Sequence, residues 1–202
     1  MVQAGRKSLS PITHGLLSWA IGERALKDSG DVARVALAGL LPDLDSLGVV
    51  FDLANRWLDR PPTDYYASLH HWLLHGAAGA LVVAGALCWH AKERGKVFLL
   101  AIAAFHLHLL CDIVGSRGPD PSEGIWPVYY LGPFSSQRGV ILWQDQWLLN
   151  GWQNVSLTVA LLLWVFYLAW RYDRSPLQPW AERAHRALVA TLRTRFGYPG
   201  QG

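Results

Sequence analysis

Charged residues and cysteines are both scarce in this sequence. Of its 202 residues only 16% are Asp, Glu, Lys or Arg, whereas soluble proteins carry about 25%. The formal net charge is only +3 and the basic residues are dispersed along the chain, which argues against a nucleic-acid-binding protein. The two cysteines, Cys88 and Cys111, lie in separate apolar runs. Neither a disulfide framework nor a thiolate metal site is therefore expected.

Several common catalytic motifs are also missing. The sequence has no HExxH zinc motif, no glycine-rich phosphate-binding loop and no serine in a nucleophile-elbow pattern. Histidines and aspartates remain as the candidate functional groups.

Apolar and aromatic side chains are abundant instead. Hydrophobic residues make up 51% of the chain, the mean hydropathy is +0.16, and there are 11 tryptophans. Indole rings concentrate where an apolar environment meets a wet edge, as at membrane interfaces. This composition predicts an integral membrane protein in contact with membrane lipids.

The apolar runs predict an all-α, polytopic membrane protein. Three long transmembrane helices are expected at residues 70–89, 97–114 and 155–170. Residues 11–27 and 32–41 are also apolar but short, since a helix rises about 1.5 Å per residue and the hydrocarbon core is about 30 Å thick. We expect these two to form a helical hairpin that packs against the longer helices.

The chain divides into a membrane-embedded domain, residues 1–172, and a basic cytoplasmic tail, residues 173–202. Within the domain, residues 115–153 form a long loop rich in glycine, proline and aromatics, which indicates either a functional loop or an interfacial anchor. An apolar patch that ends at Leu53 precedes a polar connection over residues 55–64. The tail is expected as a basic amphipathic helix on the membrane surface or as a plain solvated helix.

Histidines and aspartates gather at one end of these predicted helices. In an up-and-down arrangement, starts and ends of alternate helices fall on the same side of the bundle. This brings together His14, Asp43, Asp45, His70, His75, His108 and Asp112. Twelve Lys and Arg residues fall on the opposite side and six on this side. By the positive-inside rule, the histidine and aspartate cluster faces away from the cytoplasm.

The spacing of these residues suits metal coordination. His108 and Asp112 are four residues apart, so on a helix they share one face and can bind one ion, although a local hydrogen bond between them is an alternative. Asp43 and Asp45 follow Pro42, and in an extended segment both would project to the same face and could bridge two ions. Nitrogen and oxygen ligands suit zinc best, with manganese or iron as alternatives.

Metal-assisted hydrolysis is the chemistry that fits such a site. A bound ion lowers the pKa of water to about 7, and Asp43, Asp45, Asp112 or His71 would accept the proton. A phosphoester or ester of a lipid is the expected substrate because the site would lie at the membrane interface. His106 points to a different helix face from His108 and is expected to be a packing residue. The alternatives are a metal-binding or metal-transporting membrane protein without catalysis, and a structural membrane partner; the oligomeric state stays open.

An ordered set of short motifs resembles a known family. The set comprises Thr13-His14, the segment 39–45 (GLLPDLD), His70 with His75, the segment 108–112 (HLLCD), and the segment 133–135 (PFS). In this order they resemble the YdjM-type membrane-bound metal-dependent hydrolases over about residues 10–140. The resemblance implies a bacterial or archaeal inner-membrane protein with a metal-dependent hydrolase site, distantly similar to helical zinc phospholipases C.

One motif departs from the family pattern. Where the family usually has His-Arg-x-x-Thr-His-Ser, residues 70–76 of this chain are HHWLLHG. The resemblance therefore implies that a cationic contact to substrate or phosphate is either lost or replaced by His71, while the metal ligands are retained.

Overall fold

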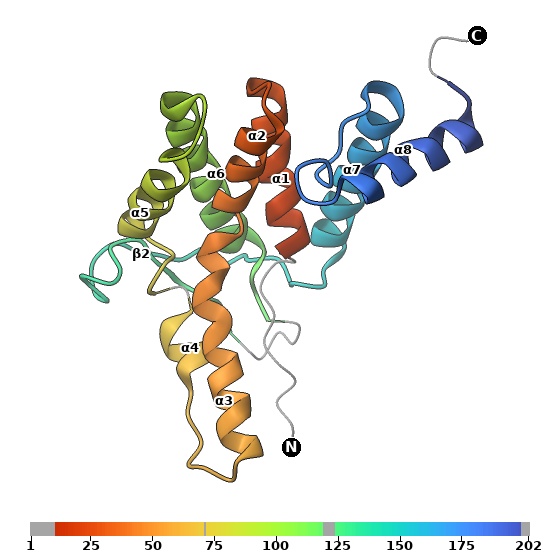
Figure 1. The fold of residues 1–202 in the computed structure, drawn as a ribbon. Helices are drawn as coiled ribbons and strands as arrows, with labels where there is room; N and C mark the ends of the chain where they lie inside the picture. Colours follow the sequence, from red (N-terminus) through yellow and green to blue (C-terminus); the bar gives the residue numbers. More distant parts are fainter. Residues whose placement is uncertain (1–10, 71, 119–123, 199–202) are drawn as a thin grey trace.

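The computed structural model describes residues 11–70, 72–118 and 124–198, which are mostly helical, as predicted. Figure 1 shows the arrangement of the elements. The helices are α1 (Pro11–Ala25), α2 (Ser29–Ala38), the 3-10 helix η1 (Leu41–Leu47), α3 (Gly48–Trp57), α4 (Tyr65–Leu69), α5 (Ala77–Cys88), α6 (Arg94–Gly115), α7 (Trp152–Tyr172) and α8 (Glu182–Phe196). A two-stranded antiparallel ribbon, β1 (Val128–Tyr129) with β2 (Val140–Ile141), completes the described elements.

Two helices in the described part of the chain, α6 and α7, are long and apolar enough to cross a membrane. They have 22 and 21 residues, or roughly 30 Å each at the helical rise. The third predicted span, residues 70–89, is shorter than expected, because α5 has only 12 residues. Residues 72–76 form turns and bends instead of a helix, and the backbone N–H of Ala77 donates to the carbonyl of Tyr130.

The core lies where α1, α2, α5 and α6 pack together. Its largest fully buried apolar side chain is Phe105, and small residues such as Ala38, Ala84 and Ala104 are also fully buried. Small side chains allow close approach of helices. At Gly39, which follows α2, an added Cβ would lie 1.8 Å from the Ser18 hydroxyl oxygen on α1. This close approach brings the end of α2 and the start of η1 against the rest of the bundle.

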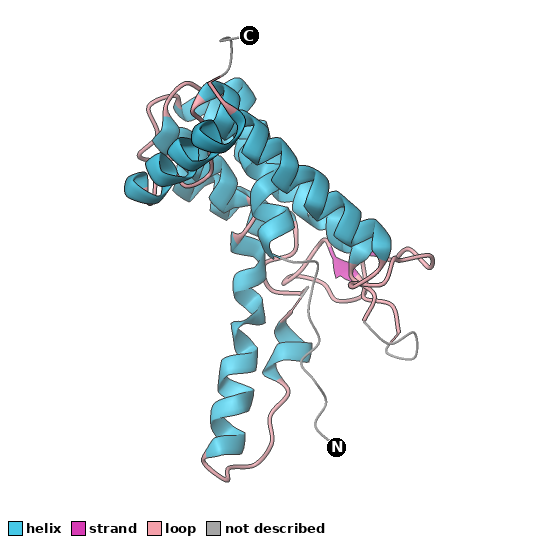
Figure 2. Cartoon of the chain, turned by 90° about the vertical axis from the view of Figure 1, so that its right-hand side faces the viewer, coloured by secondary structure: helices cyan, strands magenta, loops and turns pink. Residues whose placement is uncertain are grey.

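An arm formed by α3 and α4 projects from the bundle (Figures 1 and 2). The sequence predicted an apolar patch and a polar connection here, whereas the structure has a helix that continues to Trp57. Asp52 holds the arm together, because its carboxylate accepts hydrogen bonds from the Thr63 hydroxyl at 2.7 Å and from the backbone N–H groups of Tyr65 and Tyr66 at 2.9 Å each. These partners follow Asp52 by more than ten residues, so helical periodicity alone did not reveal them.

The long loop after α6 is attached to the bundle by polar contacts. The His106 ring bonds to the Tyr130 hydroxyl at 2.9 Å and to the Ile102 carbonyl at 2.8 Å. The buried Asn154 amide donates to the carbonyls of Gly115 and Leu148. His106 thus has the packing role predicted for it, and it positions the ribbon beside the end of α6.

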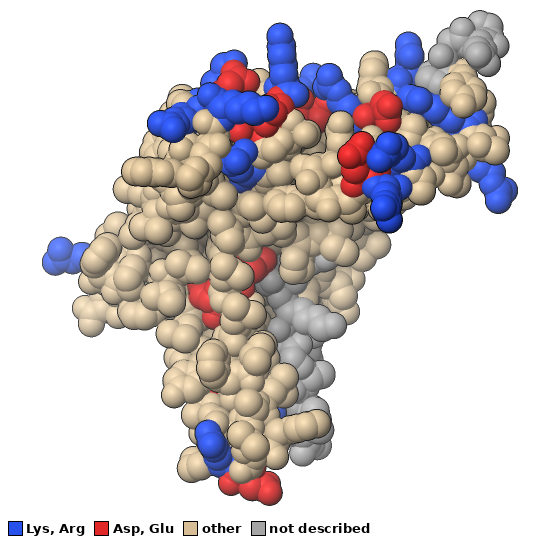
Figure 3. Space-filling model, viewed as in Figure 1, with Lys and Arg blue, Asp and Glu red and all other residues tan. Residues whose placement is uncertain are grey.

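Charged side chains gather at the end of the molecule that carries α8, and a smaller charged group marks the tip of the arm (Figure 3). The surface between them is mainly uncharged. The predicted tail helix is present as α8, with Arg193 and Arg195 in its last turn.

Candidate metal centre

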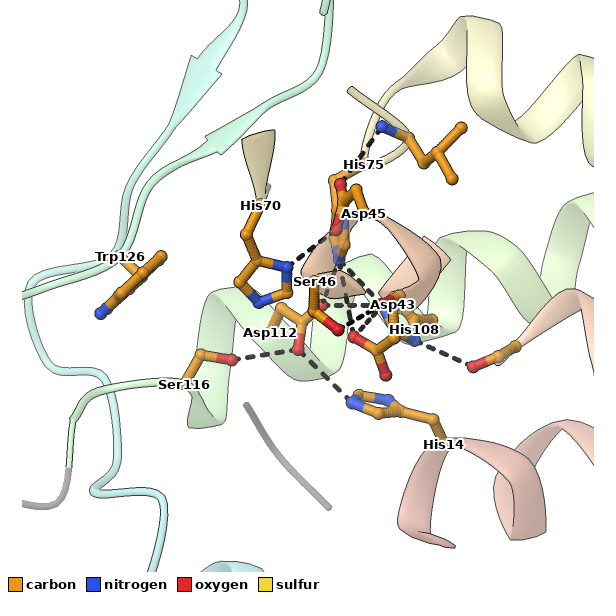
Figure 4. A network of polar contacts seen from close by, with 12 residues as sticks. His14, Asp43, Asp45, Ser46, His70, His75, His108, Asp112, Ser116 and Trp126 are labelled. Atoms are coloured by element: carbon orange, nitrogen blue, oxygen red, sulfur yellow. Dashed lines mark hydrogen bonds and ion pairs between the residues drawn. The ribbon is translucent and has the colours of Figure 1, made fainter. Parts of the chain in front are cut away.

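The structure brings the seven predicted histidines and aspartates together at the end of α6 (Figure 4). They come from five separate parts of the chain. His14 lies on α1, Asp43 and Asp45 on η1, His70 directly after α4, His75 just before α5, and His108 and Asp112 on α6. All except Asp43 are classed among the buried residues, and the Asp43 side chain is only 12% exposed.

Asp112 lies at the centre of this group. Its carboxylate is 2.9 Å from His108 Nε2 and 3.4 Å from both His75 Nε2 and His14 Nε2. Asp43 approaches from the other side, with its Oδ1 atom 3.8 Å from His108 Nε2 and 4.0 Å from His75 Nε2. We call these five residues the inner cluster: His14, Asp43, His75, His108 and Asp112.

The Nε2 atoms of His75 and His108 face each other. His108 Nδ1 is 2.9 Å from the Gly39 carbonyl oxygen, and His75 Nδ1 is 2.8 Å from the Asp45 carboxylate. Both partners are acceptors, so each Nδ1 donates and each neutral ring keeps a lone pair on Nε2. The two Nε2 atoms are only 3.1 Å apart. A proton or a cation must therefore lie between them.

A proton at that point would not satisfy the rest of the inner cluster. Among the described residues, no hydrogen bond of good geometry reaches either ring nitrogen of His14 or either carboxylate oxygen of Asp43. Buried polar groups without partners are rare and costly. A divalent cation compensates the two carboxylates and the imidazole lone pairs together, so the inner cluster fits a metal ion.

Three overlapping sets of side chains have ligand atoms within 4.8 Å of one another. The sets are His14 with Asp43 and His108, Asp43 with His70 and His75, and His75 with His108 and Asp112. Three imidazoles and two carboxylates in the inner cluster form a nitrogen and oxygen donor set, which suits zinc, iron or manganese.

Asp45 has a different place from Asp43. Its two oxygens accept from His70 Nδ1 and His75 Nδ1, each at 2.8 Å, and it belongs to none of the three sets. The segment is a 3-10 helix and not the extended strand that was expected. With three residues per turn, side chains two positions apart point about 120° away from each other. The expected common face for the two aspartates was therefore wrong.

The contacts of Asp45 fix its charge and the orientation of two rings. Burial alone would raise the pKa of this carboxyl, but its bonds to His70 and His75 outweigh burial and hold the pKa well below its usual range. Burial likewise lowers the pKa of His75, but hydrogen bonds to Asp112 and Asp45 raise it to about 9. A carboxylate on the Nδ1 atom of a metal-binding histidine fixes the tautomer that leaves Nε2 free to coordinate.

Several neighbours of the cluster were not predicted from the sequence. The Ser116 hydroxyl, one helical turn after Asp112, donates to the Asp112 carboxylate at 3.0 Å. The rings of Tyr66 and Trp126 lie against His70, with centroid distances of 5.0 and 5.7 Å. The spacing of Ser116 from Asp112 could have revealed the first contact, whereas the aromatic contacts depend on the fold of the long loop.

A cleft of about 350 Å³ opens beside the cluster. It is lined by Ser68, His70, Trp72, Tyr129 and Ser136. His70 is the one candidate ligand in its wall, so it connects the cleft to the inner cluster through Asp45. His71, one of the predicted proton acceptors, lies outside the described residues.

Comparison with known proteins gives one match. The family described as YdjM inner membrane protein matches residues 9–177, which include all seven candidate ligands. No curated protein and no solved structure matches the chain. Because the match covers far more than half of the sequence, the chain belongs to the YdjM inner membrane protein family.

Proposed function

We propose that this protein is a membrane-bound, metal-dependent hydrolase that acts on a phosphoester or ester of a lipid. The observation that carries the proposal is the inner cluster, in which three imidazoles and two carboxylates meet within ligand distance and several of their buried polar atoms have no hydrogen bond within the described part of the chain. Membership of an inner membrane family and the two candidate spans support the location.

The residues of the site would hold the ion and move protons, and Asp43 would do both. The inner cluster would hold the metal, most simply zinc, and a bound divalent ion lowers the pKa of a coordinated water to about 7 and polarises an ester oxygen. Asp43, the most exposed of the five side chains, is our candidate to accept a proton from the attacking water. His70 lies in the wall of the cleft with its Nδ1 on Asp45, so it is placed to exchange a proton with a leaving group there.

The cleft and its surroundings favour a lipid over a small soluble substrate. Two aromatic side chains, Trp72 and Tyr129, line the cleft beside Ser68 and Ser136. Aromatic rings with a polar edge suit the boundary between lipid headgroups and acyl chains. The cluster also lies at the end of α6 opposite to the basic end of the molecule, so we place it on the extracytoplasmic side of a multi-pass protein.

Metal analysis and turnover of the purified chain test this proposal. We expect about one or two zinc, manganese or iron ions per chain, and hydrolysis of a fluorogenic lipid phosphoester that is lost in His108→Ala. His90→Ala provides the matched control, because His90 is exposed at the opposite end of the bundle. Metal binding without hydrolysis of any lipid ester or phosphoester would favour a metal-binding or metal-transporting protein. Absence of bound metal in the wild type would refute the site itself.

A further inference from the structure

The arm formed by α3 and α4 has one polar, closed face and one bare, apolar face. On the closed face, Asp52 accepts three hydrogen bonds and an added Cβ on Gly48 would lie 2.7 Å from the backbone of Tyr65. The two segments of the arm are therefore packed tightly together. The apolar face is a feature of a well-ordered hairpin, not of a frayed helix.

The bare face is a continuous stripe of large side chains. Positions 47, 50, 51, 57 and 58 fall on one side of a helix with 3.6 residues per turn. We call these residues the apolar stripe, and their exposed fractions are 52% for Leu47, 54% for Val50, 63% for Phe51, 92% for Trp57 and 59% for Leu58. A contiguous exposed surface of this kind marks a binding site for a membrane or another protein.

We infer that the apolar stripe lies on the lipid surface at the site end of the bundle, with its large side chains in the leaflet. The arm begins at η1, at the end of α6 that carries the metal centre, and α6 by itself is long enough to cross the hydrocarbon core. The 10 residues of α3, about 15 Å long, therefore lie at the membrane interface, where an amphipathic helix buries its apolar face only about 5–10 Å into the leaflet.

The distribution of charge along the arm fits the same occupant. Asp59 and Arg60 are exposed in the connection that follows α3, and Arg56 points about 160° away from the centre of the stripe by helical geometry. Trp57 lies next to this charged connection, as tryptophans do at membrane interfaces. A surface that binds a soluble protein usually has charged residues around its rim, whereas the charges named here lie in the connection and on the opposite face.

The arm is also continuous with the lipid-facing part of the molecule. It follows directly from η1, whose Asp43 lies 3.8 Å from His108 on the candidate span α6, and Leu110 near that end of α6 is 53% exposed. Asp43 and Asp45 lie within η1 itself. An arm in the leaflet would thus keep lipid beside the metal centre, but the inference concerns the position of the arm and does not depend on catalysis.

Spin labels on the full chain in lipid nanodiscs test the position of the arm. Phe51→Cys and Val50→Cys place a nitroxide on the stripe, and Arg56→Cys places one on the opposite face, all in a background with Cys88→Ala and Cys111→Ala. In nanodiscs of phosphatidylethanolamine and phosphatidylglycerol, we expect the ratio of collisions with oxygen to collisions with a water-soluble nickel chelate to be severalfold higher at positions 50 and 51 than at position 56.

Two results would overturn the inference. Equal ratios at all three positions would place the arm in water. Shielding of positions 50 and 51 from both reagents, with spin–spin broadening between labelled chains, would identify a second copy as the occupant. Because two stripe positions are labelled separately, the test still gives a result if one of the two variants fails to fold. Because the measurement needs neither metal nor substrate, its failure is distinguishable from failure of the proposed hydrolase function.

Discussion

Replacing Asp45 with asparagine separates a residue that orients ligands from one that binds the ion. The Asp45 carboxylate accepts from two imidazoles through different oxygens, His70 on Oδ1 and His75 on Oδ2. Asparagine keeps the shape of the side chain but offers one acceptor oxygen and one NH₂ donor group. One of the two histidines must therefore lose its acceptor.

The structure indicates which histidine keeps its partner. The backbone N–H of Leu74 also points to Oδ2, at 3.3 Å, so two donors converge on that oxygen and only one on Oδ1. The amide oxygen of Asp45→Asn is expected at the Oδ2 position, where it still accepts from His75. The NH₂ group then faces His70, which lies in the cleft wall and outside the inner cluster.

This orientation sets the size of the effect. Loss of a carboxylate behind a metal-binding histidine costs about 10- to 100-fold in affinity. Since His75 keeps its acceptor, we expect the low end for Asp45→Asn, about tenfold or roughly 1.4 kcal/mol. In Asp45→Ala both histidines lose their acceptor, and we expect the high end, about 100-fold.

A competition titration against a chromophoric zinc chelator measures these affinities on the full chain in detergent. Asp31→Asn is the matched control, because Asp31 is also a fully buried carboxylate, accepts from the backbone N–H groups of Lys92 and Glu93, and lies at the other end of α2. Its zinc affinity should equal that of the wild type. An Asp45→Asn affinity unchanged from wild type would contradict the reasoning, and a loss as large as that of His108→Ala would make Asp45 a direct ligand.

Three further predictions concern protons, stability and the long loop. Zinc binding at pH 7 should release about two protons, because, against the effect of burial, nearby carboxylates raise the pKa of His14 to about 10 and that of His75 to about 9, and coordination requires both rings to be neutral. Calorimetry in buffers of different ionisation enthalpy measures this release, and heats that do not depend on the buffer would contradict it. Removing the metal with a chelator should lower the midpoint temperature of unfolding, because an ion at 1,000 times its dissociation constant stabilises the folded state by about 4 kcal/mol. An unchanged midpoint would contradict a bound structural ion. Gly132→Ala should reduce both thermal stability and zinc affinity, because its Cβ would lie 2.1 Å from the Trp72 carbonyl oxygen, whereas Gly85→Ala has open space and should retain both.

The long apolar runs of the sequence correctly predicted the two longest helices, α6 and α7. The stretches 97–114 and 155–170 became α6 and α7 because an uninterrupted apolar sequence has few alternatives to a helix in a membrane. The stretch 70–89 is equally apolar at its end, yet its first part is held in a turn by the loop that follows α6 and by Asp45. Contacts with residues so distant in sequence leave no periodic pattern.

The convergence of the candidate ligands followed from the direction of successive helices, which needs no side-chain detail. The roles of individual ligands did not follow, because they depend on local backbone geometry. Asp43 and Asp45 show this most directly: an extended backbone would give both the same role, whereas the 3-10 helix directs Asp43 to the inner cluster and Asp45 to the far side of His75. A single turn type therefore changes a pair of equivalent carboxylates into one candidate ligand and one residue that orients two imidazoles. This division of roles explains why the affinity loss expected for Asp45→Asn is small compared with that for loss of an inner residue.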